Sequence, residues 1–156
     1  MAHFPVEGTP APAFTLKRDG GGAVALQDFA GKKLVLYFYP KADTPGCTKE
    51  SIAFNGLRQA FAAADTAILG VSADEVVAQD KFKAKYDLEI PLGSDPDRAM
   101  LEAYGVWVEK SMYGRKYMGI ERATLLIDRD GTVAKTWPKV KVPGHAEEVL
   151  EAAKAL

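Results

Sequence analysis

The sequence predicts an α/β domain whose mixed central β-sheet carries helices on both faces, and three observations indicate it. Two continuous apolar runs of strand length, Leu34–Tyr39 and Thr66–Ser72, are each followed by a helix-like segment. Such runs are typical of strands that are buried on both faces. Two later strands, Ala123–Asp128 and Thr132–Trp137, meet at Asp130-Gly131, a strong hairpin-turn signal. Two strand–helix units followed by an antiparallel pair favour a mixed sheet.

Two further elements flank the first buried strand. An N-terminal β-hairpin is expected between Ala13–Leu16 and Ala23–Leu26, with its turn at Gly20-Gly21-Gly22. After the buried strand a helix is expected to begin with Thr44 as N-cap and Pro45 as its first residue. Proline suits that position because the N–H that it lacks would have no partner there.

The rest of the chain supplies helices and shorter strands. The helix that begins at Thr44 is expected to continue to about Ala63, with a buried stripe of Ile52, Leu57, Ala60 and Phe61. The other expected elements are a helix at Glu75–Tyr86, a short helix at Asp95–Tyr104, strand-like pieces at Val106–Glu109 and Tyr113–Met118, and a last helix from Pro143-Gly144 that buries Val149, Leu150, Ala153 and Leu156.

The composition favours one soluble globular domain over residues 1–156. A chain of 156 residues is long enough to bury a core. The formal net charge of −1 gives no bulk electrostatic reason to expect nucleic acid or an anionic membrane as a partner. The first residues lack the layout of a signal peptide, and the apolar runs are far shorter than the ~20 residues that span a bilayer. A cytoplasmic location is therefore expected.

Cys47 is the only cysteine of the chain, and it falls in the first turn of the helix expected after the buried strand. Helix N-termini present unpaired N–H groups and the positive end of the helix dipole, which favour thiolate over thiol. A lone intracellular cysteine is more often a small core residue, but this position favours a nucleophile. One cysteine excludes an intrachain disulfide and a thiolate-rich metal site, and it suits a reducing compartment.

The order of elements fits a thioredoxin-like fold. The redox motif of that fold is absent, because a chain with one cysteine contains no Cys-x-x-Cys. The cysteine count therefore excludes a dithiol–disulfide oxidoreductase.

The pattern Pro40-x-x-x-Thr44-x-x-Cys47 resembles the peroxidatic loop of the peroxiredoxins, and its extension to Glu50 resembles the PrxQ, or bacterioferritin comigratory protein, subfamily. The resemblance covers nearly the whole chain and includes Ala11–Leu16, Ala67–Ser72, Ala103–Val106 and Gly119–Asp128. Several separated motifs in the right order make the match far more specific than the loop alone.

This resemblance implies a thiol-dependent peroxidase that reduces hydrogen peroxide and organic hydroperoxides through a sulfenic acid on Cys47. In that family the counterpart of Thr44 hydrogen-bonds through its hydroxyl, and that of Pro40 shields the pocket. Arg122 matches the arginine that holds the thiolate ionised. The backbone N–H groups of Gly46 and Cys47 are candidates to bind the peroxide oxygens. No metal and no organic cofactor are implied.

One departure from the family pattern concerns the second half of the reaction. Many PrxQ-type proteins carry a resolving cysteine five residues after the first, where this chain has Ile52. The resemblance therefore implies a single-cysteine variant whose sulfenic acid is reduced by an external thiol, from thioredoxin, glutaredoxin or glutathione. A monomer or weak homodimer is expected. The alternatives are a redox-sensing binding protein that uses Cys47 oxidation to engage a partner, and a hold-type chaperone.

Several other residues receive structural interpretations. Glu50 is left outside the catalytic set, as a residue that supports the first helical turn or pairs locally. Of the two histidines, His3 belongs to the terminus and His145 to a helix start. Four aromatic residues are expected in the core or at a pocket rim, and three cations on a solvated face: Trp107, Tyr113, Tyr117 and Trp137, and Lys110, Arg115 and Lys116.

Overall fold

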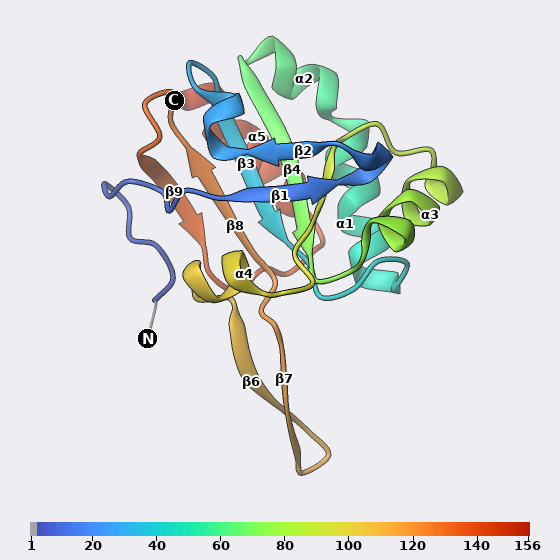
Figure 1. The fold of residues 1–156 in the computed structure, drawn as a ribbon. Helices are drawn as coiled ribbons and strands as arrows, with labels where there is room; N and C mark the ends of the chain where they lie inside the picture. Colours follow the sequence, from blue (N-terminus) through green and yellow to red (C-terminus); the bar gives the residue numbers. More distant parts are fainter. Residues whose placement is uncertain (1–2) are drawn as a thin grey trace.

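The computed structural model describes residues 3–156, and its centre is a seven-stranded mixed sheet with the order β2-β1-β5-β4-β3-β8-β9 (Figure 1). The strands are β1 (Thr15–Arg18), β2 (Ala23–Ala25), β3 (Lys33–Phe38), β4 (Thr66–Ser72), β5 (Leu92–Ser94), β6 (Trp107–Met112), β7 (Arg115–Ile120), β8 (Ala123–Ile127) and β9 (Val133–Trp137). Strand β4 runs parallel to its two neighbours, β3 and β5, and all other neighbouring strands in this sheet are antiparallel. The predicted mixed sheet is confirmed.

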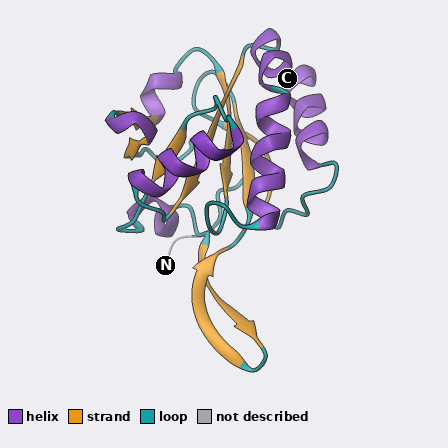
Figure 2. Cartoon of the chain, turned by 90° about the vertical axis from the view of Figure 1, so that its right-hand side faces the viewer, coloured by secondary structure: helices purple, strands orange, loops and turns teal. Residues whose placement is uncertain are grey.

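The helices lie on both faces of this sheet (Figure 2). They are the short 3₁₀ turns η1 (Asp19–Gly21) and η2 (Leu26–Phe29), and the α-helices α1 (Pro45–Gly56), α2 (Arg58–Ala63), α3 (Val76–Tyr86), α4 (Ala99–Ala103) and α5 (His145–Ala155). None of the helices in residues 3–156 has the length and apolar character needed to cross a membrane.

Strand β3 lies between two hydrophobic cores, which explains its unbroken apolar sequence. Leu34, Leu36 and Phe38 pack in the core that includes the buried side chains of α4. Val35 and Tyr37 point to the opposite core, which includes Cys47 and residues of α1, α2, α3 and α5. Because successive side chains of a strand point to opposite faces, a strand covered on both sides must be apolar at every position.

The helix predicted from Thr44 to Ala63 is in fact two helices, since the backbone at Leu57 leaves the helical conformation with φ −98° and ψ 5°. The predicted buried stripe is wrong at Ile52, which is 46% exposed. Besides Thr48, four side chains of α1 are buried, and they share a spacing of three, four and seven residues: Cys47, Glu50, Ser51 and Phe54. This is the spacing of one helical face. Glu50 and Ser51 on that face are polar, so a search for an apolar stripe does not detect it.

The segment before β8 also differs from the prediction. Strands β6 and β7 form a separate two-stranded hairpin, and Tyr113 lies in its turn with φ 53° instead of opening a strand. The expectation that Tyr113 and Tyr117 are core or rim residues is wrong, because they are 98% and 44% exposed. Leu156, the residue that follows α5, is likewise 42% exposed and does not join the buried face of that helix.

Three smaller differences concern element boundaries. The predicted N-terminal hairpin is present, with β1 beginning two residues later than expected at Thr15. The helix predicted from Asp95 is shorter, because Arg98 has a positive φ of 66° and α4 begins after it. The three-residue strand β5 was not predicted and pairs with both β4 and β1.

Candidate active site

The turn from β3 into α1 places Cys47 in the first helical turn, where its side chain is 1% exposed. Thr44 occupies the N-cap position with extended backbone, and Pro45 begins the helix as predicted. The Thr44 hydroxyl, however, donates to the carbonyl oxygen of Lys41 at 2.8 Å and makes no capping hydrogen bond. Thr44 is therefore the N-cap by position, as predicted, without a side-chain capping bond. The N–H groups of Gly46 and Cys47 belong to the first turn, where a helix offers its donors no internal partner.

The guanidinium of Arg122 lies directly beside the thiol. Its Nη2 donates to Cys47 Sγ at 3.3 Å, and its Nη1 donates to Glu50 Oε1 at 2.7 Å. Pairing of Phe38 in β3 with Ala123 in β8 brings the two segments together, since Arg122 directly precedes β8. A Cβ atom at Gly46 would lie 3.1 Å from Arg122 Nη2, so glycine leaves the room that the guanidinium occupies.

Glu50, which the sequence analysis placed outside the catalytic set, lies beside Arg122 in the candidate site. It is 1% exposed, and its partner is Arg122, 72 residues away, not a neighbour on its own helix. Burial raises the pKa of Glu50 to about 7, although the charge and hydrogen bond of Arg122 oppose the rise. Its second carboxyl oxygen, Oε2, has no hydrogen-bond partner within residues 3–156. Glu50 is therefore a positioning residue that holds the guanidinium against the sulfur.

Two buried tyrosines of the β3 end support this arrangement. The hydroxyl of Tyr37 shares a 2.8 Å hydrogen bond with Ser51 of α1, and burial raises the pKa of Tyr37 well above its usual range. A Cβ at Gly70 would meet the Tyr37 ring at 2.6 Å, so glycine at this place in β4 makes room for the ring. The Tyr39 hydroxyl donates to Gln79 Oε1 at 2.5 Å in α3.

The loop between β3 and α1 is tied to α3 and to the residues before it. Asp74 accepts hydrogen bonds from the N–H of Ala42 at 2.8 Å and from the hydroxyl of Ser72 at 2.6 Å. Asp43, with a positive φ of 62°, accepts from Lys85 at 2.9 Å and from the Tyr86 hydroxyl at 2.5 Å. These contacts fix the backbone that presents Cys47.

His145 begins α5, as predicted, but it lies in the core on the Cys47 side of the sheet. Its Nε2 is 2.8 Å from the Thr124 hydroxyl, and its side chain is 6% exposed. Burial lowers the pKa of His145 to about 4, so the ring is neutral near pH 7. Its ring packs against Phe54 and Trp137, an arrangement that suits a structural role.

The structure thus brings together three of the predicted site residues, Cys47, Arg122 and Gly46. Pro40 is half-buried at the end of β3, and the Thr44 hydroxyl faces a carbonyl of its own loop, so their parts in catalysis stay predictions. Within residues 3–156 no three His, Cys, Asp or Glu side chains lie close enough together to hold a metal ion.

The chain is similar in sequence and in fold to several known proteins. The family model described as "AhpC/TSA family" matches residues 8–136. A putative peroxiredoxin bcp from Coxiella burnetii is 50% identical over 143 residues, which cover 92% of this chain and 95% of that protein. Crystallised PrxQ from Xylella fastidiosa superimposes with a TM-score of 0.93 at 40% identity, covering 99% of this chain and 98% of that one.

A third relative adds information about substrates. The bacterioferritin comigratory protein of Xanthomonas campestris, whose structures concern its alkyl peroxide reduction activity, is 48% identical with a TM-score of 0.87. The alignment covers 91% of this chain and 90% of that one.

Proposed function

The chain belongs to the AhpC/TSA family, among the Bcp/PrxQ peroxiredoxins, which are thiol peroxidases, and from that premise we propose that Cys47 is its peroxidatic residue and works with an external thiol. The observation that carries the proposal is the 3.3 Å contact between Arg122 Nη2 and the sulfur of the only cysteine, in the first turn of α1.

In the first step the Cys47 thiolate attacks one oxygen of the peroxide. An S–O bond forms, the O–O bond breaks, and the leaving oxygen takes up a proton as water or alcohol. Arg122 and the first-turn N–H groups of Gly46 and Cys47 can stabilise the negative charge as it moves from sulfur to the leaving oxygen. A thiol that is 1% exposed admits a slender O–O group more readily than a bulky electrophile.

In the second step an external thiol attacks the sulfenic sulfur, releases water and forms a mixed disulfide with Cys47. A second thiol then releases Cys47 as the free thiol. The chain has no other cysteine, and Ile52 stands where many PrxQ proteins have a resolving cysteine. The substrate class includes organic hydroperoxides, which the alkyl peroxide reduction of the Xanthomonas campestris relative supports.

The test is steady-state consumption of hydrogen peroxide with dithiothreitol as reductant. Wild type should turn over, and Cys47→Ser, which has no ionisable thiol, should not. Peroxide without reductant should leave a monomer whose sulfenic acid reacts with a dimedone-type reagent, and then the irreversible oxidised forms. Turnover by Cys47→Ser would refute the role of Cys47. A nearly complete disulfide-linked dimer would refute reduction by an external thiol, and oxidation once without turnover would favour the redox-sensing alternative.

A further inference from the structure

The hairpin of β6 and β7 projects from the body of the protein, and no strand of the main sheet pairs with it (Figures 1 and 2). It has six cross-strand pairs, from Trp107–Ile120 at the base to Met112–Arg115 at the tip. An isolated two-stranded hairpin is at best marginally stable in water, and its open edges are ready to pair with another chain. A protruding hairpin of this length is therefore a candidate docking element.

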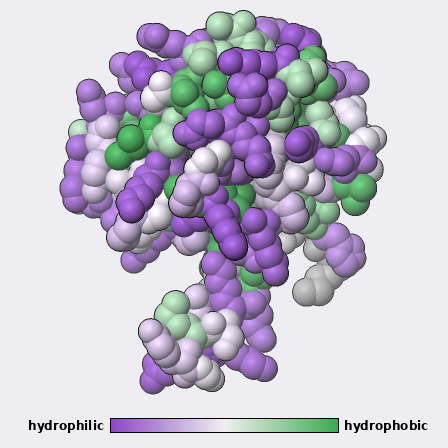
Figure 3. All heavy atoms as spheres, turned by 180° about the vertical axis from the view of Figure 1, so that it is seen from behind, coloured by the Kyte–Doolittle hydropathy of each residue, from purple (hydrophilic) through white to green (hydrophobic). Residues whose placement is uncertain are grey.

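Its surface has the composition of a binding site. Half of the eight exposed large hydrophobic side chains in residues 3–156 belong to this hairpin: Met112, Tyr113, Tyr117 and Met118. In a view from behind, the stem is hydrophilic and the tip is paler (Figure 3). Tyrosine and methionine are enriched in the cores of protein–protein interfaces. The exposed apolar residues thus lie where a partner can reach them.

The charge on the hairpin is positive. The hairpin carries three cations, Lys110, Arg115 and Lys116, and one carboxylate, Glu109, in a chain whose formal net charge is −1. Glu109 lies 3.9 Å from the Lys116 ammonium, on the other face from Lys110 and Arg115. The cross-strand pairs Lys110–Tyr117 and Met112–Arg115 fall on the same face, because side chains two residues apart share a face, and that face carries no acid. Two copies would bring like charges together, so the hairpin is complementary to an acidic partner, not to itself.

The hairpin is joined directly to the candidate active site. Strand β7 ends at Ile120, and Arg122, two residues later, contacts the sulfur of Cys47. The N–H of Glu121 donates to the carbonyl of Val106 at 2.8 Å and closes the hairpin base. The Phe38–Ala123 pairing puts the end of β3, from which the Cys47 loop departs, beside the start of β8. Hairpin and thiol therefore lie at one end of the sheet.

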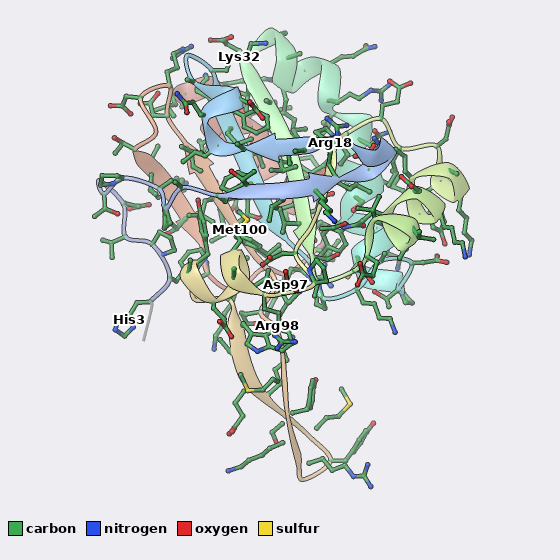
Figure 4. The ribbon with its side chains drawn as sticks, viewed as in Figure 1. His3, Arg18, Lys32, Asp97, Arg98 and Met100 are labelled. Carbon is green, nitrogen blue, oxygen red and sulfur yellow. The ribbon has the colours of Figure 1, made fainter. Side chains whose placement is uncertain are left out.

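The base of the hairpin is fixed to the body by a further contact. The guanidinium of Arg98 stacks over the Trp107 ring at 5.0 Å from its centroid (Figure 4). This contact, together with the packing of Ile120 in the core, holds the base while the tip stays free. A partner bound at the tip would accordingly be held at a defined place relative to Cys47.

We propose that the β6–β7 hairpin is the docking element for the external reductant, and that this reductant is a protein dithiol whose reactive thiol is surrounded by acidic and apolar surface. The proposal rests on the reduction of Cys47 by an external thiol put forward above. One thiol of the partner attacks the sulfenic sulfur and releases water, and its second thiol breaks the mixed disulfide, so the partner leaves as a disulfide and Cys47 as a thiol. Because Cys47 is 1% exposed, a thiol that is held at the site should react with it faster than an equal thiol free in solution.

The test compares a protein reductant with a small one. The probe is an acidic bacterial thioredoxin, recycled by its reductase and NADPH, and the small thiol is dithiothreitol. Two variants alter the hairpin, the charge reversal Lys110→Glu/Arg115→Glu on the face without an acid and the apolar truncation Tyr113→Ser, and neither changes a core side chain. The control is Lys32→Glu, a charge reversal at an exposed residue at the opposite end of the molecule (Figure 4).

The charge reversal should raise KM for thioredoxin about tenfold or more, the effect of roughly 1.4 kcal/mol of lost attraction. Tyr113→Ser should raise KM in the same direction. The rate with dithiothreitol and the rate of Cys47 oxidation should not change, and Lys32→Glu should behave as wild type. Added salt should weaken the wild-type reaction with thioredoxin more than that of the charge-reversed variant.

Four outcomes would overturn the docking role. Two concern the hairpin variants: an unchanged KM for thioredoxin, or a rate with dithiothreitol that falls as much as the rate with thioredoxin. Two concern the wild type: reduction by glutathione but not by thioredoxin, or binding of the hairpin to anionic vesicles in place of thioredoxin. All four leave the peroxidase intact. If the wild type consumes no peroxide with dithiothreitol, the proposed function itself fails, so the two failures are distinguishable.

Discussion

Replacing the buried carboxyl of Glu50 with an amide should change how folding stability depends on pH. Burial raises the pKa of Glu50 from 4.5 to about 7, against the opposing effect of Arg122. Between these values the folded protein keeps a proton that the unfolded chain has lost. The stability from this group is therefore complete below pH 4.5 and is lost as the pH rises to about 7. At 1.36 kcal/mol for each pKa unit, the loss is about 3 kcal/mol.

His145 acts in the opposite direction in the same range of pH. Burial lowers its pKa from 6.5 to about 4, so its stability contribution is present above pH 6.5 and is lost as the pH falls to about 4. The magnitude is again about 3 kcal/mol. In the wild type the two groups oppose each other between pH 4.5 and 6.5, and their slopes largely cancel. Glu50→Gln removes one slope, so that of His145 remains.

The assay is urea unfolding followed by tryptophan fluorescence at a series of pH values between 4.5 and 7 and at constant ionic strength. The free energy of unfolding of Glu50→Gln, relative to wild type, should increase by about 3 kcal/mol from the lower pH to the higher. The matched control Glu7→Gln removes an exposed carboxyl and should show a constant difference. A constant difference for Glu50→Gln as well would refute the reasoning, because it would mean that the buried carboxyl titrates as it does in the unfolded chain.

The remaining predictions concern the residues around the sulfur. Arg122→Met should cut the second-order rate with hydrogen peroxide about a hundredfold, because it removes the donor that lies 3.3 Å from the Cys47 sulfur; an unchanged rate would remove Arg122 from the site. Gly46→Ala should slow the same step, measured by stopped flow, because its Cβ would lie 3.1 Å from Arg122 Nη2; wild-type speed would show that the guanidinium has room to move. Thr44→Val should lose about 1 kcal/mol of stability with its bond to Lys41. It should also lose peroxidase rate, which Thr44→Ser retains; equal rates in the two variants would limit Thr44 to the loop.

The parts of the fold that could be predicted are those whose signal is local. Strand β4 matches the predicted Thr66–Ser72, because a strand covered on both faces has an unbroken apolar sequence. The pair β8 and β9 followed from the turn at Asp130-Gly131. Strand β5 was not predicted because three residues are too few to show the alternation of a strand. Its pairing with β4 and β1 makes it a strand.

The site could be predicted in part for the same reason. The place of Cys47 in a strand–helix turn is local, and the arginine came from family resemblance. The pairing of Glu50 with Arg122 spans 72 residues, so no local sequence pattern predicts it. One signal was available, since Cys47, Glu50, Ser51 and Phe54 share a helical face. Polar residues among the apolar ones on such a face indicate buried hydrogen bonds, which here go to Arg122 and Tyr37.

The anchors of the Cys47 loop bear on how a one-cysteine enzyme completes its cycle. To reach a second sulfur on another element of the same chain, the loop would have to leave its contacts with Asp74, Lys85 and Tyr86. This chain has no such sulfur, so no step of its cycle requires the loop to carry Cys47 to another element of the chain. The sulfenic acid then stays where Arg122 and the first turn of α1 hold it, open to a second peroxide until a thiol arrives. Reduction and further oxidation therefore compete at one fixed sulfur, and a docking element beside it shifts that competition toward reduction by keeping the reductant close.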